Sequence, residues 1–184
     1  MLVKLCQDGD QRAFEALFKQ HRRPVLNIIL RFNIDGESAQ DLIQEVFIQV
    51  FKSIQGFKGE SEFSTWLYRM TVNKCIDYLR KNKKDKNTLR IDEKFYQSEE
   101  GPVAGYNPEK EYEHKMIQRM ILEAAGKVHI KSRKVFVLFS LGNLKIDKIA
   151  EILKIPVGTV KFRLFEARNQ IRQILIGQGV QHVL

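Results

Sequence analysis

The feature that most constrains the fold is a gap in the helical pattern of apolar residues between positions 87 and 112. On both sides of the gap, apolar residues recur every three or four positions, as they do on one face of an α-helix. Within 92–113, seven acidic residues stand against two lysines, and glycines and prolines accumulate. Such a segment is typical of a flexible linker. The chain therefore predicts an all-α protein of two small helical domains, over 1–86 and 113–184, joined by a linker over 87–112.

The first domain has the pattern of three long amphipathic helices that pack as one bundle. The first helix follows the candidate N-caps Asp8 and Asp10, a break comes at 33–36, and the third helix starts near 61–64. Trp66, the only tryptophan, is expected to be a core anchor rather than a base-stacking platform. The apolar stripes are Phe14, Leu17, Phe18, Val25, Ile28, Ile29 and Phe32; Leu42, Val46, Phe47, Val50, Phe51 and Ile54; and Trp66, Leu67, Met70, Ile76 and Leu79.

The second domain ends in two short helices that meet at a tight turn within 149–164, which is the pattern of a helix-turn-helix. Its buried side is expected to comprise Ile149, Leu153, Ile155, Val160 and Leu164. The second helix then faces outward with several cations and fits the major groove of DNA. With two earlier helical segments around 116–122 and 135–139, the domain is expected to be a four-helix unit.

The net charge of +9, from 31 lysines and arginines against 22 acidic residues, favours a polyanionic partner such as nucleic acid. Cys6 and Cys75 belong to no C-x-x-C pair and are expected to be reduced thiols in the core. The four histidines lack the spacing of a helical metal site, so no metal or cofactor is expected. No apolar run is long enough for a transmembrane helix and no signal peptide is recognisable, which predicts a cytoplasmic location.

Three motifs in the first domain carry a family resemblance. They are D-L-I-Q-E-V-F at 41–47, G-E-S-E-F-S-T-W-L-Y-R at 59–69 and N-K-C-I-D-Y-L-R at 73–80. Together they resemble conserved region 2 of the extracytoplasmic-function (ECF) sigma factors of RNA polymerase, in the sigma-70 family. The helix-turn-helix is similar to region 4 of the same family, and both domains come in the right order.

This resemblance implies a non-enzymatic initiation factor that binds core RNA polymerase through its β′ and β subunits, recognises promoter DNA and melts the minus-ten region. An anti-sigma factor is a further implied partner. The implied polymerase contacts on the β′ coiled coil are Asp41, Gln44, Glu45 and Gln49. The minus-ten candidates are Arg69, Asn73, Lys74, Tyr78, Arg80, Lys81, Lys83 and Lys84, in a segment, 69–90, with a net charge of +6. The minus-thirty-five candidates are Thr159, Lys161, Phe162, Arg163, Phe165, Glu166 and Arg168, with base reading expected in the first turns.

The chain departs from the family at several positions. Phe162 stands where a small residue is usual and Glu166 where a basic one is usual, so an altered minus-thirty-five preference is expected. Lys154 occupies a turn position where glycine is common, at a cost of about 1 kcal/mol if φ is positive there. Val128-His129 replaces a leucine-proline pair, which leaves the start of the next helix, near 131–132, less defined.

Two other functions fit parts of the pattern. A dimeric operator-binding regulator would use the helix-turn-helix without polymerase, but its dimer core would need apolar surface where the 69–90 segment is cationic. A nuclease or recombinase could hold a divalent cation between Asp41 and Glu45, yet no third ligand or nucleophile is positioned near them. The prediction is therefore a protein with no catalytic residue and no small-molecule substrate.

Overall fold

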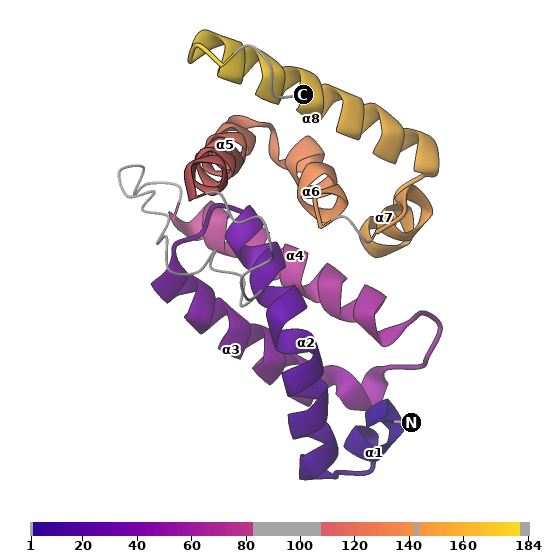
Figure 1. Ribbon diagram of the computed structural model, residues 1–184. Helices are drawn as coiled ribbons and strands as arrows, with labels where there is room; N and C mark the ends of the chain where they lie inside the picture. The colour runs from indigo at the N-terminus through magenta and orange to yellow at the C-terminus, as the bar shows by residue number, and fades with distance from the viewer. Residues whose placement is uncertain (1, 83–107, 142–143, 181–184) are drawn as a thin grey trace.

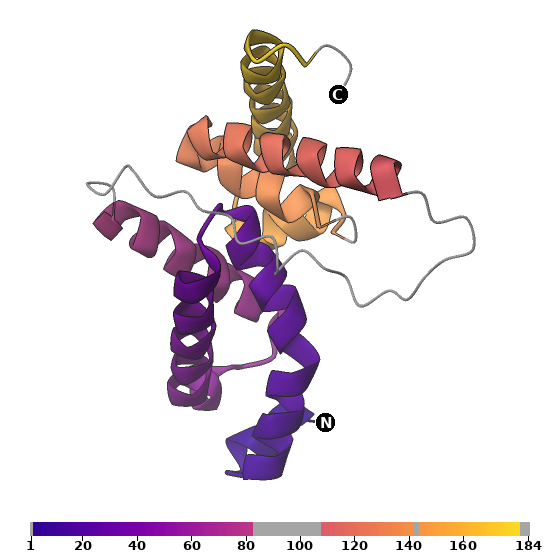
Figure 2. The same ribbon diagram turned by 60° about the vertical axis from the view of Figure 1, so that its left-hand side comes forward.

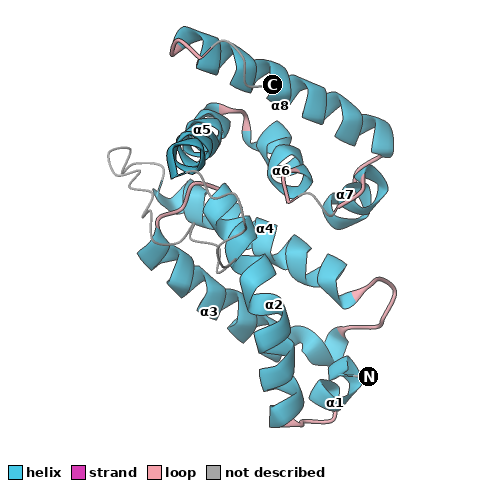
Figure 3. Cartoon of the chain, viewed as in Figure 1, coloured by secondary structure: helices cyan, strands magenta, loops and turns pink. Residues whose placement is uncertain are grey.

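The computed structural model describes residues 2–82, 108–141 and 144–180, and in these ranges the chain is helical and contains no strand (Figures 1 and 3). The all-α prediction is confirmed. The elements are α1 (Leu2–Gln7), α2 (Gln11–Arg31), α3 (Gly36–Ser53), the 3-10 turn η1 (Ile54–Gly56), α4 (Phe63–Lys81), α5 (Pro108–Lys127), α6 (Ile130–Phe139), α7 (Ile146–Leu153) and α8 (Val157–Gly177).

One helix and the start of another differ clearly from those expected from the sequence. Helix α1 was not anticipated, because six residues are too few to show a clear helical period. Helix α5 begins at Pro108, inside the segment expected to be linker, and proline is favoured at a first helical position since its missing N–H needs no partner there. The rest of that expected linker, 87–107, lies outside the described residues.

Local capping fixes the start of two helices in the first domain. The Asp10 carboxylate accepts hydrogen bonds from the backbone N–H groups of Arg12 (2.8 Å) and Ala13 (3.1 Å), as expected for this N-cap. The Asp35 carboxylate accepts from the Ser38 N–H (2.9 Å) at the start of α3. Between α2 and α3, Asn33 adopts a positive φ of 57°, a conformation that asparagine tolerates, so the chain turns there.

The core of the first domain confirms most of the apolar stripes. Val25, Ile28, Val46 and Leu67 are fully buried, and both free cysteines are buried as well. Phe51 is a correction, because 63% of its surface is exposed and its ring only meets the ring of Phe14, 5.3 Å away and edge-on.

Trp66 packs into an aromatic cluster that is only partly buried. Its ring lies 5.3 Å from that of Phe57 and 5.7 Å from that of Phe63. The anchoring role expected for Trp66 fits this position, since the cluster joins the loop after η1 to the first turn of α4.

In the second domain, α5 to α8 form the expected four-helix unit. Ile149, Ile152, Val160 and Ile171 are fully buried between the helices. Helix α6 begins at Ile130, with the His129 side chain accepting a long hydrogen bond (3.4 Å) from the Lys131 N–H, so this start lies one residue before the expected range.

The turn between α7 and α8 contains a strained lysine. Lys154 has φ 52° and ψ 50°, in the left-handed region, and ends α7 through its N–H to the Glu151 carbonyl (3.3 Å). The positive φ expected at this position is therefore present, and the cost of about 1 kcal/mol for a non-glycine residue applies.

Replacing this lysine by glycine is expected to stabilise the protein. Lys154→Gly removes the clash of Cβ with the backbone and should raise the free energy of unfolding by up to about 1 kcal/mol, or the Tm by about 2–4 °C. Thermal unfolding followed by circular dichroism measures this change. Gln173→Gly, in the exposed part of α8, is the matched control and should lower the stability by about 1 kcal/mol. A lower Tm for Lys154→Gly would contradict the prediction.

The two domains pack on each other, as the two views in Figures 1 and 2 show. Helix α7 lies against α4, and α6 contacts the end of α2, while α8 lies on the outer side.

None of the described helices has the length and apolar character needed to cross a membrane. Within the same residues, no group of three or more histidines, cysteines and acids could bind a metal ion.

Candidate polymerase and promoter interface

The polar residues expected to bind polymerase lie on one exposed face of α3. Asp41, Gln44, Glu45 and Gln49 are all exposed, and their spacing of three to four residues places them on neighbouring turns. We call these four residues the docking stripe. Sequence reasoning missed Ile48, which lies between them and is 53% exposed. An exposed isoleucine on a polar helix face adds apolar contact area of the kind that protein interfaces use at their centre.

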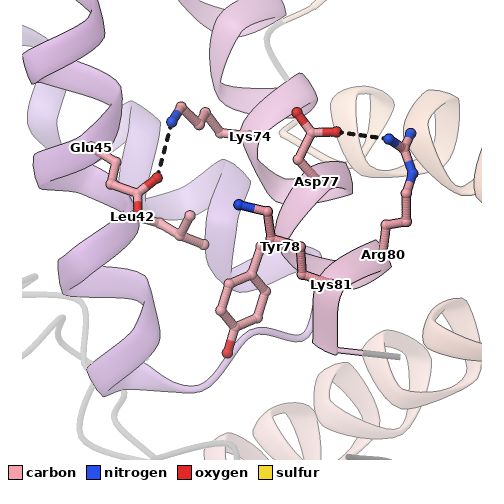
Figure 4. A pocket seen from close by; sticks show the side chains of 7 residues that line it. All are labelled: Leu42, Glu45, Lys74, Asp77, Tyr78, Arg80 and Lys81. Carbon is pink, nitrogen blue, oxygen red and sulfur yellow. Dashed lines mark hydrogen bonds and ion pairs between the residues drawn. The ribbon is translucent and has the colours of Figure 1, made fainter. Parts of the chain in front are cut away.

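The docking stripe adjoins the cationic end of α4 across a groove of about 380 Å³ (Figure 4). At this groove the Lys74 ammonium pairs with the Glu45 carboxylate at 3.0 Å, which links a predicted DNA contact with a predicted polymerase contact. Arg80 pairs with Asp77 at 3.3 Å one turn earlier on α4. Both pairs are exposed enough to contribute little stability. The cations can therefore exchange these carboxylates for phosphates at small cost.

Tyr78, a minus-ten candidate, lines the same groove and also makes a contact between two helices. Its hydroxyl donates a hydrogen bond of 2.7 Å to Ser38 Oγ on α3, and its side chain is half-buried. In Figure 4 the ring points away from the Lys74–Glu45 pair. The residue therefore holds α4 against α3, and its contact with the minus-ten element stays a prediction.

The other minus-ten candidates differ in exposure. Asn73, Arg80 and Lys81 are exposed, and Lys74 is half-buried. Arg69 is half-buried and lines two clefts, one beside Asn73 and one beside Glu151 and Lys154 of the second domain. Lys83 and Lys84 lie outside the described residues.

The recognition helix α8 presents an aromatic and cationic surface. It begins at Val157, as expected, and Phe162 and Phe165 are 65% and 64% exposed. Lys161 and Arg168 are exposed, while Thr159 and Arg163 are half-buried at the edges of this surface. The Arg168 guanidinium lies 4.8 Å from the centre of the Phe139 ring, so a cation–π contact directs it toward α6.

Glu166, expected in the groove-facing set, has a partner inside the second domain. Its carboxylate accepts a hydrogen bond from the buried Ser132 hydroxyl of α6, and its side chain is half-buried. A carboxylate engaged in this way fixes α8 on α6, and its contact with DNA stays a prediction. Only the structure could reveal this, because the sequence separation of 34 residues hides the pair.

Both domains match known protein families. The family model described as Sigma-70 region 2 matches residues 17–85, and the one described as Sigma-70, region 4 matches residues 118–171. RNA polymerase sigma-H factor of Pseudomonas aeruginosa is 30% identical over 95% of this chain and 92% of its own length. ECF RNA polymerase sigma-E factor of Haemophilus influenzae is 32% identical over 92% of this chain and 91% of its own.

Solved structures support the same fold. CnrH, in complex with the cytosolic domain of CnrY, aligns with a TM-score of 0.70 at 21% identity, over 96% of each chain. The sigma factor RpoE from Bartonella quintana, in complex with the anti-sigma factor NepR, aligns with a TM-score of 0.64 at 16% identity, over 89% of this chain and 96% of that one.

The sequence matches cover both helical domains in order, which removes the dimeric-regulator and nuclease alternatives. The chain belongs to the ECF sigma factors of the sigma-70 family, non-enzymatic initiation factors that bind core RNA polymerase and direct it to promoters.

Proposed function

We propose that three surfaces of this sigma factor divide the work of initiation. The docking stripe on α3 binds the β′ coiled coil of core polymerase, with Asp41, Gln44, Glu45 and Gln49 as its polar contacts and Ile48 at its centre. The observation that carries this proposal is the Lys74–Glu45 pair at 3.0 Å, since it joins a residue of the proposed polymerase surface to a residue of the proposed DNA surface. Docking on polymerase then positions the α4 cations for the opening of the promoter.

The second surface binds the minus-ten element. Arg69, Lys74, Arg80 and Lys81 attract the phosphate backbone, and the Asn73 amide hydrogen-bonds a base edge. The exposure of Asn73 in a cleft that it lines with Lys74 and Trp66 supports this role. Lys83 and Lys84 continue the positive charge in the sequence. Tyr78 acts as a positioning residue through Ser38.

The third surface binds the minus-thirty-five element through α8. Lys161 and Phe162 lie in its first turns, where a recognition helix reads base edges, and the exposed Phe162 ring suits the methyl group of thymine. Thr159, Arg163 and Phe165 flank this contact, with Thr159 and Arg163 toward the sugar-phosphate backbone. Arg168 reaches a phosphate only by leaving the Phe139 ring on which it packs. Glu166 holds α8 in place through Ser132.

The proposed partners follow from this division. The β subunit of polymerase joins β′ as a contact of the second domain, and an anti-sigma factor is expected because solved structures of similar fold hold such inhibitors. A protein that acts on promoter DNA is expected in the cytoplasm. The proposed activity needs no cofactor and no small-molecule substrate.

The experiment that tests this function is run-off transcription with core RNA polymerase and a pool of promoters from the same genome. Specific transcripts that require the protein are the expected result, and their upstream sequences give both promoter elements. Sequence-specific binding of duplex DNA by the protein alone, with no transcript from the pool, would refute the division of labour proposed above.

Replacing Phe162 tests the third surface. Phe162→Ser should reduce the preference for one thymine in the minus-thirty-five element by about fivefold or more, since a base-pair contact is worth about 1 kcal/mol or more. A promoter-library transcription assay with reconstituted holoenzyme measures the preference. A basic residue is usual in the family at position 166, but Glu166 is left unchanged in this test. Arginine there would remove the hydrogen bond that Glu166 accepts from the Ser132 hydroxyl. Ile176→Ser, an exposed apolar residue at the far end of α8, is the matched control. An unchanged preference at every position for Phe162→Ser would refute the base contact.

A further inference from the structure

Helix α8 runs across α6 in the second domain, as the two views in Figures 1 and 2 show. Ala167 of α8 is fully buried, whereas Phe162 and Phe165 are exposed. Successive side chains of a helix point about 100° apart, which places the two phenylalanines on the side opposite Ala167. By the same count, Glu166 and Arg168 lie on the two flanks of α8, between its buried side and its outward side.

The first flank of α8 is held at the start of α6. Ser132 is 1% exposed, and its hydroxyl donates a hydrogen bond to the Glu166 carboxylate. Ser132 is the third residue of α6, which begins at Ile130, so the carboxylate lies beside the positive end of that helix. A hydrogen bond to an ionised acceptor is also stronger than one between neutral groups. The charge of Glu166 is therefore stabilised inside the second domain.

The second flank of α8 is held at the end of α6. Phe139 is the last residue of α6, and the Arg168 guanidinium lies 4.8 Å from the centre of its ring. A cation is favoured at the C-terminus of a helix as well as over an aromatic face. Ser132 and Phe139 are about two turns apart, or about 10 Å along the axis. The acid and the base of α8 thus lie at the two ends of α6 that suit their charges.

Contacts on both flanks oppose rotation of α8 about its own axis. A roll in one direction pulls Glu166 away from Ser132, and a roll in the other direction pulls Arg168 away from Phe139. Base reading depends on this roll, since it decides which side chains of a recognition helix enter the groove. The same contacts keep one acid and one cation away from the phosphates on either side of the groove.

We propose that Ser132 and Phe139 are positioning residues for recognition of the minus-thirty-five element. Together with Glu166 and Arg168 they form what we call the α6 clamp. The clamp sets the face of α8 that enters the major groove and withdraws the two charged side chains from its phosphates. This inference rests on the third surface proposed above, because it concerns how that surface binds DNA.

The two halves of the clamp have opposite expected effects on DNA binding. Ser132→Ala removes the donor and lets Glu166 turn outward, where its charge repels phosphate and should weaken binding by about fivefold. Phe139→Leu keeps an apolar side chain but removes the ring face, so Arg168 can bind a phosphate. That contact should tighten binding and steepen the slope of log affinity against log salt by about 0.9. A general loss of stability would weaken binding in both variants.

The test measures binding of reconstituted holoenzyme to a short fluorescent duplex that carries the minus-thirty-five element, at several KCl concentrations. Ser132→Ala/Glu166→Gln should restore the affinity to within about twofold of wild type, because glutamine carries no charge. Ser140→Ala is the matched control, since this hydroxyl donates to the Val137 carbonyl within α6 (2.8 Å), and it should change neither affinity nor slope. In the free protein, Ser132→Ala should lower the Tm by about 2–4 °C.

Three results would each overturn the clamp. They are an unchanged affinity in Ser132→Ala, no rescue by the added Glu166→Gln, and a slope no steeper than that of wild type in Phe139→Leu. Circular dichroism checks folding, and the Phe139→Leu slope decides the question by itself if Ser132→Ala does not fold. A wild-type holoenzyme that binds equally well to a duplex without the minus-thirty-five element would instead refute the third surface. The two failures are therefore distinguishable.

Discussion

Asp41→Ala/Gln44→Ala is expected to abolish promoter-directed transcription while leaving the fold intact. Both side chains are exposed on α3 and form no part of the core. Central interface residues often cost about 2 kcal/mol or more when truncated, which makes a loss of at least about a hundredfold in core-polymerase affinity the expected result for the pair. Run-off transcription and a direct binding assay with core polymerase measure the two effects.

The variant leaves out Glu45 for a structural reason. The Glu45 carboxylate pairs with Lys74, so its removal would change the DNA surface together with the polymerase surface. Glu37→Ala/Lys52→Ala provides the control, since both residues are exposed on the same helix but lie outside the docking stripe. Near-normal transcription by Asp41→Ala/Gln44→Ala at limiting sigma factor, or an equal loss in the control, would show that the stripe is not the docking surface.

The fold could be predicted from the sequence wherever burial repeats at helical spacing. Val25, Val46 and Leu67 follow that spacing and are fully buried. The left-handed turn at Lys154 could be anticipated only through the family resemblance, because glycine is common at this position in the family, and the structure has φ 52° there. Helix α1 could not, since it is stabilised by packing on α2 and η1 rather than by a pattern of its own.

The candidate sites could be predicted only as far as their helix faces. The docking stripe and Lys161 are exposed, as their positions on amphipathic helices require. Tyr78 and Glu166 were assigned outward roles, and both hydrogen-bond inward to serines far away in the sequence. Phe51 follows the buried spacing, yet 63% of its surface is exposed beside the Phe14 ring. Contacts with residues far away in the sequence determine whether such side chains point inward or outward. The helical spacing in a single sequence does not reveal these contacts.

Reversing the charges at the end of α4 should prevent promoter opening. Arg80→Glu/Lys81→Glu replaces two exposed cations by acids beside the groove that Figure 4 shows. Removing one cation from a phosphate of single-stranded DNA lowers the slope of log affinity against log salt by about 0.7, so the two substitutions together account for about 1.4. Holoenzyme binding to a forked promoter at several KCl concentrations measures this slope, and permanganate reactivity of unpaired thymines measures opening.

The same reversal should spare polymerase binding, because neither residue belongs to the docking stripe. Lys4→Glu/Lys19→Glu changes the net charge by the same amount at exposed positions on α1 and α2, away from the groove, and should leave the salt slope unchanged. An equal fall in slope for both variants would mean that only total charge matters. A normal slope with normal opening in Arg80→Glu/Lys81→Glu would instead remove α4 from the minus-ten surface. The expected difference between the variants arises because counterion release depends on the phosphates that the protein touches, and Arg80 and Lys81 line the proposed minus-ten groove whereas Lys4 and Lys19 do not.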